Sequence, residues 1–143
     1  MREPGRSIAP YSADDFAAVD GLWRAVFPDD PPTSHAAIVI PAKLAIQPEL
    51  FLLARDEGHR VIGTVMGGYD GHRGWIYRLA VDPAERRCGV GAALVRAIEE
   101  RLALLGCPKI NLQIRSGNDA VVGFYEQLGF VVEPRVSMGR RIA

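Results

Sequence analysis

The sequence predicts a single α/β domain of the α+β kind, with a mixed, mostly antiparallel sheet of six to seven strands and about four helices. Three observations lead to this prediction. Short runs of β-branched and aromatic residues alternate with glycine- and aspartate-containing turns as far as Val81, which is typical of antiparallel hairpins. A long helical pattern then separates two strands, and such a crossover implies a parallel pair. The 143 residues fit one domain, residues 1–143.

The N-terminal part predicts a short strand followed by a helix. Ser7–Pro10 is the expected strand. Ser12, with Asp15 three residues later, has the spacing of a capping box and marks the start of a helix. Pro28 ends this helix, whose apolar stripe consists of Phe16, Val19, Trp23, Val26 and Phe27.

A proline-rich acidic loop and a second helical segment come next. We expect Asp29 and Asp30 to be solvated, with the alternative that they attract a cationic amine. Residues 35–46 favour a helix that is interrupted or kinked at Pro41. Residues 38–40 fit an extended segment equally well, because all three are apolar and β-branched.

The middle of the chain predicts three strands joined by tight turns. The strands are expected at residues 51–55, 60–69 and 75–81, with hairpin turns at 56–58 and 70–74. Asp82 and Pro83 end the last of these strands, since proline lacks an amide donor.

The C-terminal half begins with a helix from Gly89 to Leu105, which Gly106 ends as a C-cap. A strand at 110–114 follows. A short helix is then expected from Asp119 to Leu128, with Asn118 as its cap and Gly129 as its stop. The last predicted strands are at residues 130–133 and 137–142.

The composition is that of an ordinary globular protein. Lysine plus arginine and aspartate plus glutamate number 17 each, which gives no support for nucleic acid or an anionic membrane as a partner. The chain has no apolar run of ~20 residues and no secretory leader pattern, so we expect a cytoplasmic protein. Cys88 and Cys107 are not spaced as a metal or redox motif, which fits a reducing compartment.

The most informative stretch lies between the strand at 75–81 and the long helix. It reads Arg86, Arg87, Cys88, Gly89, Val90, Gly91, Ala92. Glycines let backbone amides approach a ligand closely, and a helix N-terminus adds unpaired N–H groups and a positive dipole end. With two arginines beside them, these features predict a site for a phosphate or pyrophosphate, the alternative being an ordinary capped turn.

Two common phosphate motifs fit this stretch poorly. A P-loop requires Lys-Ser or Lys-Thr after its glycines, and neither follows here. A dinucleotide fingerprint requires a third Gly or Ala where this chain has Leu94. It also wants an acidic residue after the next strand, which ends in Gln113, Ile114 and Arg115.

The stretch instead resembles the R/Q-x-x-G-x-G/A motif of the GCN5-related N-acetyltransferases, with Arg86, Gly89 and Gly91 at the motif positions. A second motif of that family, N-x-x-x-x-x-F-Y-x-x-x-G-F, resembles the residues from Asn118 to Phe130. The two motifs occur in the family's order, and the resemblance covers essentially the whole chain. Residues 63–74 and 106–110 look especially similar to a small bacterial subgroup, the YpeA-like acetyltransferases.

The resemblance implies a fold in which the sheet splays at its central parallel pair and holds acetyl-CoA there as a co-substrate, without a metal. It implies that backbone groups of Leu79, Ala80 and Val81 pair with the pantetheine arm and that one N–H polarises the thioester. The loop amides from Arg87 to Ala92 would hold the phosphates, and Arg86 would assist. Asn118 and Phe124 would complete the donor site.

The resemblance also assigns a general acid. Tyr125 matches the family tyrosine that is proposed to protonate the departing CoA thiolate, the alternative being a core aromatic residue. The relatives' glutamate near the start of the donor strand is replaced here by Trp75 and Ile76. Asp70, His72 and Tyr77 are candidates to border the acceptor amine, and the first two also suit a polar turn.

Other reactive side chains carry weaker hypotheses. Cys88 lies where a helix dipole and arginines would lower a thiol pKa, but it has no identifiable catalytic partner. His35, His59 and His72 are not spaced as metal ligands.

The sequence therefore predicts an acetyl-CoA-dependent N-acetyltransferase. The acceptor would be a small-molecule amine, a protein N-terminus or a lysine, and the protein would be a monomer or homodimer. Two alternatives remain open: a non-catalytic acyl-CoA-binding or sensing domain, and an acyltransferase that uses another acyl-CoA.

Overall fold

The computed structural model describes residues 6–142 and divides them into two compact units, one reaching to Leu112 and the other starting at Gln113. The larger unit contains a five-stranded sheet in chain order: β1 Ser7–Pro10, β2 Phe51–Arg55, β3 Val61–Tyr69, β4 Gly74–Val81 and β5 Ile110–Asn111. The first four strands pair antiparallel, and β5 is parallel to β4. The predicted fold class, with its one parallel pair, is confirmed.

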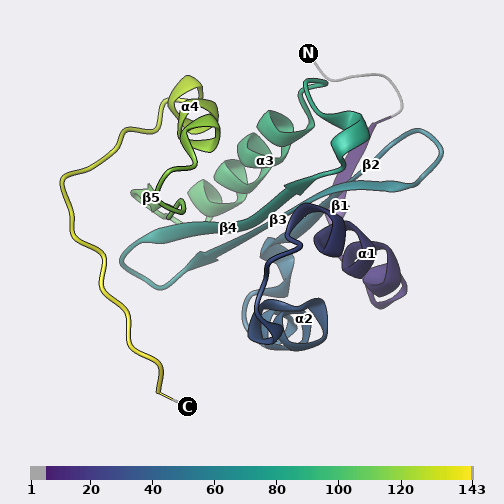
Figure 1. Ribbon diagram of the computed structural model, residues 1–143, viewed down its shortest axis with the longest axis horizontal. Helices are drawn as coiled ribbons and strands as arrows, with labels where there is room; N and C mark the ends of the chain where they lie inside the picture. The colour runs from purple at the N-terminus through teal and green to yellow at the C-terminus, as the bar shows by residue number, and fades with distance from the viewer. Residues whose placement is uncertain (1–5, 143) are drawn as a thin grey trace. The chain divides into compact units, whose positions relative to one another are not determined.

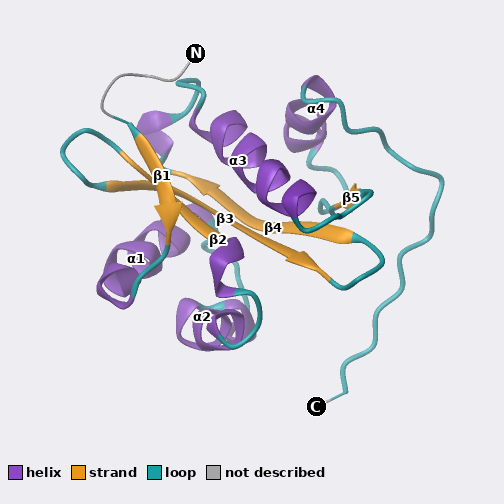
Figure 2. Cartoon of the chain, turned by 180° about the vertical axis from the view of Figure 1, so that it is seen from behind, coloured by secondary structure: helices purple, strands orange, loops and turns teal. Residues whose placement is uncertain are grey.

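Helices cover both faces of this sheet. The helices α1 (Phe16–Val26) and α2 (Ala36–Leu44) lie on one face and α3 (Val90–Leu104) lies on the other, as Figure 1 and Figure 2 show from opposite sides. The α1 and α2 face is closed by a buried cluster that includes Val19, Leu22, Trp23, Ala36, Ile40, Phe51, Leu53, Met66 and Ala80. On the opposite face, α3 contributes the fully buried Leu94, Ile98 and Leu102.

The predicted capping pattern begins the first helical segment. The backbone N–H and the hydroxyl of Ser12 donate to Asp15 Oδ2 at 2.9 and 3.2 Å. A 3-10 turn at Ala13–Asp15 then leads into α1. Asp15 Oδ1 accepts a bond from Arg55 Nη2 of β2 at 2.6 Å, so the start of the helix is tied to the sheet.

The second helical segment resolves the ambiguity at residues 38–40. The helix α2 is continuous from Ala36 to Leu44 and includes Pro41. The predicted helix is therefore confirmed without an interruption at Pro41, and the extended alternative is wrong. Proline removes one intrahelical hydrogen bond. Burial of Ala36 and Ile40 against the sheet holds the helix in place despite that loss.

Glycines bring α3 close to the sheet. A Cβ atom on Gly63 would lie 2.8 Å from Leu94 Cδ1 and 3.1 Å from the Ala80 carbonyl oxygen. A Cβ atom on Gly67 would lie 2.6 Å from Ile98 Cγ1. The absence of side chains at these positions therefore fixes the distance between α3 and β3.

The smaller unit contains α4 (Asp119–Gln127). Asn118 Oδ1 accepts a bond from the Val121 amide at 3.4 Å, and Gly129 has a φ of +96°, so the predicted cap and stop are confirmed. Both features set the helix boundaries locally.

The structure has fewer strands than the sequence predicts. Residues 110–114 form only the two-residue β5, and residues 130–142 form no strand in the described part of the chain. The side chains that suggested strands here are largely exposed: Val131, Val132, Val136, Met138 and Ile142. The preference of β-branched residues for strands reflects a pleated, half-buried surface, which this segment does not have.

We predict that Gly63→Ala lowers the free energy of unfolding by about 1–3 kcal/mol, because the added methyl group overpacks the contact with Leu94 and the Ala80 carbonyl. Chemical denaturation measures the change. Gly68→Ala in the same strand is the matched control, since its nearest neighbour would be Gln47 Oε1 at 3.7 Å, an ordinary contact. Equal effects of the two substitutions would show that α3 is not held by this close approach.

Candidate active site

The glycine loop joins β4 to α3. The 3-10 turn Pro83–Glu85 follows the strand, and Arg86 is extended. Arg87 and Gly89 then have φ values of +67° and +80°, and Gly89 is the N-cap of α3. The first amides of α3 have no partner within the helix. They lie beside the exposed side chains of Arg86, Arg87 and Cys88, as the phosphate hypothesis requires.

A third arginine reaches this loop from the start of the chain. Arg6 Nη1 donates to the Cys88 carbonyl at 2.8 Å, and Arg6 Nη2 lies 3.9 Å from the position of a Cβ on Gly89. Arg6 was not among the predicted site residues. No local pattern marks it, because 82 residues separate it from its partner. Its positive charge adds to the attraction of this loop for anions.

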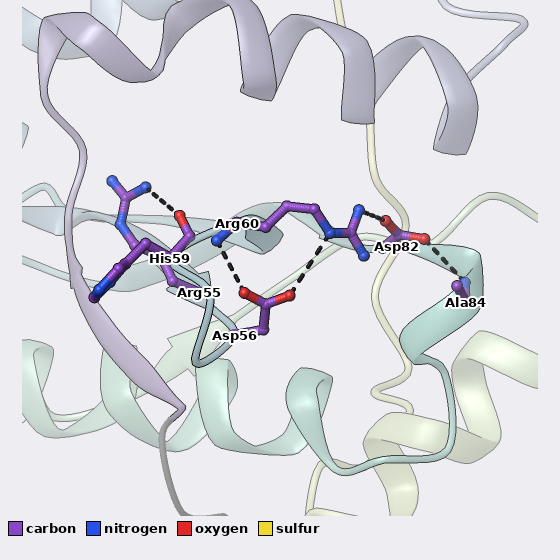
Figure 3. Close-up of polar contacts among 6 residues, drawn as sticks. All are labelled: Arg55, Asp56, His59, Arg60, Asp82 and Ala84. Atoms are coloured by element: carbon purple, nitrogen blue, oxygen red, sulfur yellow. Dashed lines mark hydrogen bonds and ion pairs between the residues drawn. The ribbon is translucent and has the colours of Figure 1, made fainter.

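A polar network fixes the corner where β4 ends (Figure 3). Arg60 lies between two carboxylates, with its Nη1 2.8 Å from Asp82 Oδ2 and its Nε 3.6 Å from Asp56 Oδ2. Asp82 Oδ1 accepts a bond from the Ala84 amide at 2.9 Å. The Ala84 amide and then the Arg60 guanidinium hold the pKa of Asp82 below its usual value. Asp82 therefore stays ionised and holds the turn before the glycine loop.

The strand β4 is paired along one edge over its length, whereas its other edge is open beyond the start of the strand. Its pairing with β5 covers only Gly74 with Ile110 and Trp75 with Asn111, whereas its pairing with β3 continues to Val81. The Asp82 amide donates to the Ile62 carbonyl at 2.9 Å, on the β3 side. Because backbone groups alternate along a strand, the amides of Leu79 and Val81 point to the other edge. An extended chain can pair with them there.

A bulge interrupts β4 next to these amides. The register shifts between Thr64 and Met66 of β3, whose partners are Ala80 and Tyr77. The extra length of β4 is accommodated at Arg78, which has a φ of +53°. The displaced Arg78 carbonyl accepts a bond from the Thr64 hydroxyl at 2.9 Å, and Thr64 Oγ1 accepts one from Trp23 Nε1 at 2.9 Å. The bulge is therefore fixed from the α1 side.

The Arg78 side chain corrects the expectation for the acidic loop. Arg78 Nη2 lies 2.7 Å from Asp30 Oδ2, and the two side chains are only 15% and 11% exposed. Asp30 is therefore paired rather than solvated, while Asp29 is exposed as predicted. No local pattern indicates this contact, because an arginine in a strand is usually on the surface.

The candidate acceptor residues lie at two places. Asp70 Oδ1 accepts bonds from the amides of His72 and Arg73 at 2.8 and 2.7 Å, so it closes the β3–β4 turn, and His72 is exposed there. The Arg73 and His72 amides keep the pKa of Asp70 below its usual value. Tyr77 is half exposed beside the bulge, and burial raises the pKa of its phenol. Lys43 Nζ lies 5.7 Å from the centre of the Tyr77 ring.

In the smaller unit, Tyr125 is enclosed by aromatic rings. Its ring packs edge-to-face against Phe124 at 5.0 Å and Phe130 at 5.4 Å between centroids. Burial raises the pKa of Tyr125 to about 12. The phenol is therefore protonated at neutral pH, as a proton donor must be.

Among residues 6–142, no group of three or more His, Cys, Asp or Glu side chains is arranged to hold a metal ion. Within the same residues, no helix is both long and apolar enough to span a membrane.

Comparison with known proteins gives consistent matches. The sequence profile of the acetyltransferase (GNAT) family matches residues 16–130. An acetyltransferase of Pectobacterium atrosepticum is 42% identical over 137 residues, which is 94% of each chain. Ard1 of Thermoplasma volcanium superposes with a TM-score of 0.80 at 27% identity, covering 90% of this chain and 84% of that one. A NatC complex bound to Gag peptide and CoA gives a TM-score of 0.76 at 26% identity, covering 88% and 84%.

We predict that Gly89→Ala weakens acetyl-CoA binding at least tenfold, because a methyl group would occupy space needed by a phosphate at the loop. The φ of +80° also makes the substitution destabilising, by about 1–2 kcal/mol. Gly106→Ala at the other end of α3, with a φ of +84°, is the matched control for that strain. Calorimetric titration and denaturation of both variants separate the two effects. Native affinity in Gly89→Ala would exclude this loop as the phosphate site.

Proposed function

The chain belongs to the acetyltransferase (GNAT) family, and on this premise we propose that it transfers the acetyl group of acetyl-CoA to a primary amine. The amine nitrogen attacks the thioester carbon directly in a ternary complex. The new C–N bond forms, the C–S bond breaks, the nitrogen loses a proton and the CoA thiolate gains one. The observation that carries this proposal is the open edge of β4, which leads directly to the glycine loop.

The donor would lie along that edge. Its pantetheine amides would pair with backbone groups of Leu79 and Val81, as an added strand does. Its phosphates would bind the amides from Arg87 to Ala92, with the arginines at the loop supplying positive charge. The Leu79 amide then suits the role of polarising the thioester carbonyl, because it points to the open edge beside the bulge.

The acceptor must reach the thioester as a neutral amine. The half-exposed Tyr77 belongs to the donor strand β4 and is the nearest of the proposed acceptor residues to the bulge. Asp70 and His72 belong to the turn at the start of β4 and would border the acceptor further away. We propose that these residues bind the amine, with water as the route for its proton.

Tyr125 is the proposed general acid for the departing thiolate. Support comes from its place in the second family motif and from its pKa of about 12, which keeps the phenol protonated at every physiological pH. Asn118 supports this segment as the cap of α4, and the proposed donor contact of Phe124 comes from the same helix.

We predict that acetyl-CoA raises the melting temperature of the protein and that NAD does so much less. Both carry a pyrophosphate, but only acetyl-CoA presents a pantetheine arm to the open edge of β4. A donor at about 100 times its dissociation constant contributes about 2.7 kcal/mol to stability. Thermal denaturation over a concentration series measures the difference, and equal shifts from NAD would contradict the proposal.

Turnover decides between an enzyme and a binding domain. Release of free CoA thiol is measured with a panel of amines: an aminoglycoside, spermidine, free lysine and a peptide with an unblocked N-terminus. Binding of acetyl-CoA without thiol release from any amine would favour the acyl-CoA-binding alternative. Faster release from succinyl-CoA than from acetyl-CoA would favour another acyl donor.

We predict that Tyr125→Phe lowers kcat by about ten- to thousandfold, since it keeps the ring and removes only the proton donor. Acetyl-CoA affinity should barely change. Because burial raises the pKa of Tyr125 to about 12, the parent kcat should show no decline from loss of this proton below about pH 10. Initial rates across pH values measure both effects.

Tyr11→Phe is the control for loss of a tyrosine hydroxyl, since Tyr11 stacks on Phe51 at 4.7 Å and has no proposed role in the reaction. A kcat for Tyr125→Phe within about twofold of the parent, with chemistry rate-limiting, would make Tyr125 a packing residue and solvent the acid.

A further inference from the structure

Arg78 is held at both its backbone and its side chain. It is the bulged residue of β4, and its φ of +53° is unfavourable for a residue with a side chain. Such a conformation persists only where the surroundings determine it. Its carbonyl is fixed by the buried Thr64 hydroxyl, and Thr64 is fixed in turn by Trp23.

The side chain of Arg78 is fixed independently of its backbone. The guanidinium carbon lies 4.4 Å from the centre of the Trp23 ring and 4.2 Å from that of Phe27, so two aromatic rings stack on the cation. Arg78 Nη2 donates to Asp30 at 2.7 Å and to the Ser34 carbonyl at 3.2 Å. Arg78 Nε is buried and has no hydrogen-bond partner among the described residues.

These contacts join two parts of the chain that are distant in sequence. Phe27, Asp30 and Ser34 all belong to the loop between α1 and α2, residues 27–35, which we call the α1–α2 loop. Arg78 belongs to β4, where it directly precedes Leu79. The conformation of the bulge and the position of the α1–α2 loop are therefore linked through one side chain.

We propose that Arg78 and Asp30 are a positioning pair for acetyl transfer. This inference rests on the proposed function, because it assigns the pair to the Leu79 amide that polarises the thioester. The pair holds the bulge in the conformation that turns this amide to the open edge of β4. It also holds the α1–α2 loop beside the same strand through the bonds to Asp30 and Ser34.

The energetics suit such a role. An ion pair with little exposure contributes little net stability, because desolvation offsets the attraction, but removing one partner leaves the other charge uncompensated. The pair therefore fixes a geometry more than it strengthens the fold. An oxyanion donor acts only when it is correctly placed, and a displacement of about 1 Å can reduce the rate about a hundredfold.

A second ion pair provides a matched control. Arg55 and Asp15 lie 2.6 Å apart with side chains 25% and 9% exposed, which resembles the Arg78–Asp30 pair. This pair joins β2 to the start of α1 and touches neither β4 nor the α1–α2 loop through its side-chain bonds. Arg55→Met should therefore disturb the fold comparably without affecting acetyl transfer.

The test compares Arg78→Met, Asp30→Ala, the double variant and Arg55→Met. We expect kcat, measured with the best acceptor of the amine panel, to fall about ten- to hundredfold in Arg78→Met and in Asp30→Ala. The acetyl-CoA dissociation constant should rise no more than about threefold, because most donor contacts are at the glycine loop. The double variant should be no slower than Arg78→Met, since both residues act through one contact. Arg55→Met should keep kcat within about twofold.

Hydrogen exchange gives a readout that needs no acceptor. Arg78→Met and Asp30→Ala should each accelerate amide exchange in residues 27–35 and in residues 77–82, and Arg55→Met should leave both segments unchanged. If each variant affects only the segment it belongs to, or if kcat stays within about twofold of the parent, the positioning role is wrong. If Arg78→Met does not fold, Asp30→Asn, which keeps the side-chain shape and removes its charge, should still lower kcat at least threefold.

Failure of the proposed function has a different signature. A parent protein that binds acetyl-CoA but acetylates no amine would contradict the enzymatic proposal. In that case the exchange comparison still decides whether Arg78 and Asp30 link the bulge to the α1–α2 loop.

Discussion

The structure depends on an asymmetry of one strand, because β4 is paired with β3 along one edge and loses β5 from the other edge after Trp75. Unpaired backbone amides and carbonyls at a sheet edge are ready to pair with another extended chain. Leu79 and Val81 present such groups beside the loop that starts α3. The same stretch of backbone therefore belongs to the sheet on one side and to the proposed donor site on the other.

Because that edge is open, the rest of the larger unit must stabilise the sheet. The sheet must be stable without a long fifth strand, and its stability comes from packing on both faces. On one face, glycines at positions 63 and 67 allow α3 to lie so close that an added methyl group would meet its side chains. On the other face, Trp23 packs in the core and also donates to Thr64, which holds the bulge. Core packing and the geometry of the bulge therefore share residues, because Trp23 serves both.

Local sequence signals made many of the helix boundaries and buried faces predictable. The capping pattern of Ser12 and Asp15, the glycine stops and the apolar periodicities each depend on residues close in sequence. The structure confirms them, except that Phe16 of the predicted stripe is 37% exposed. The links through Arg6, Asp30 and Arg78 were not predictable, because they join residues 44 to 82 positions apart and leave no periodic trace. The prediction of the last strands was wrong for another reason. Residues 130–142 have the composition of strands but lack the half-buried surface on which the strand preference of β-branched residues depends.

The pairing of Asp30 also bears on the expectation that the acidic loop attracts a cationic amine. An acidic loop suggests attraction of a cationic substrate, but a carboxylate neutralised by a guanidinium at 2.7 Å attracts little at a distance. Asp29 alone of the two aspartates remains exposed to solvent. Attack on a thioester requires the neutral form of the amine, so a strongly negative wall would stabilise the wrong protonation state. The ion pair with Arg78 therefore removes most of the attraction that Asp30 would have for a cationic amine.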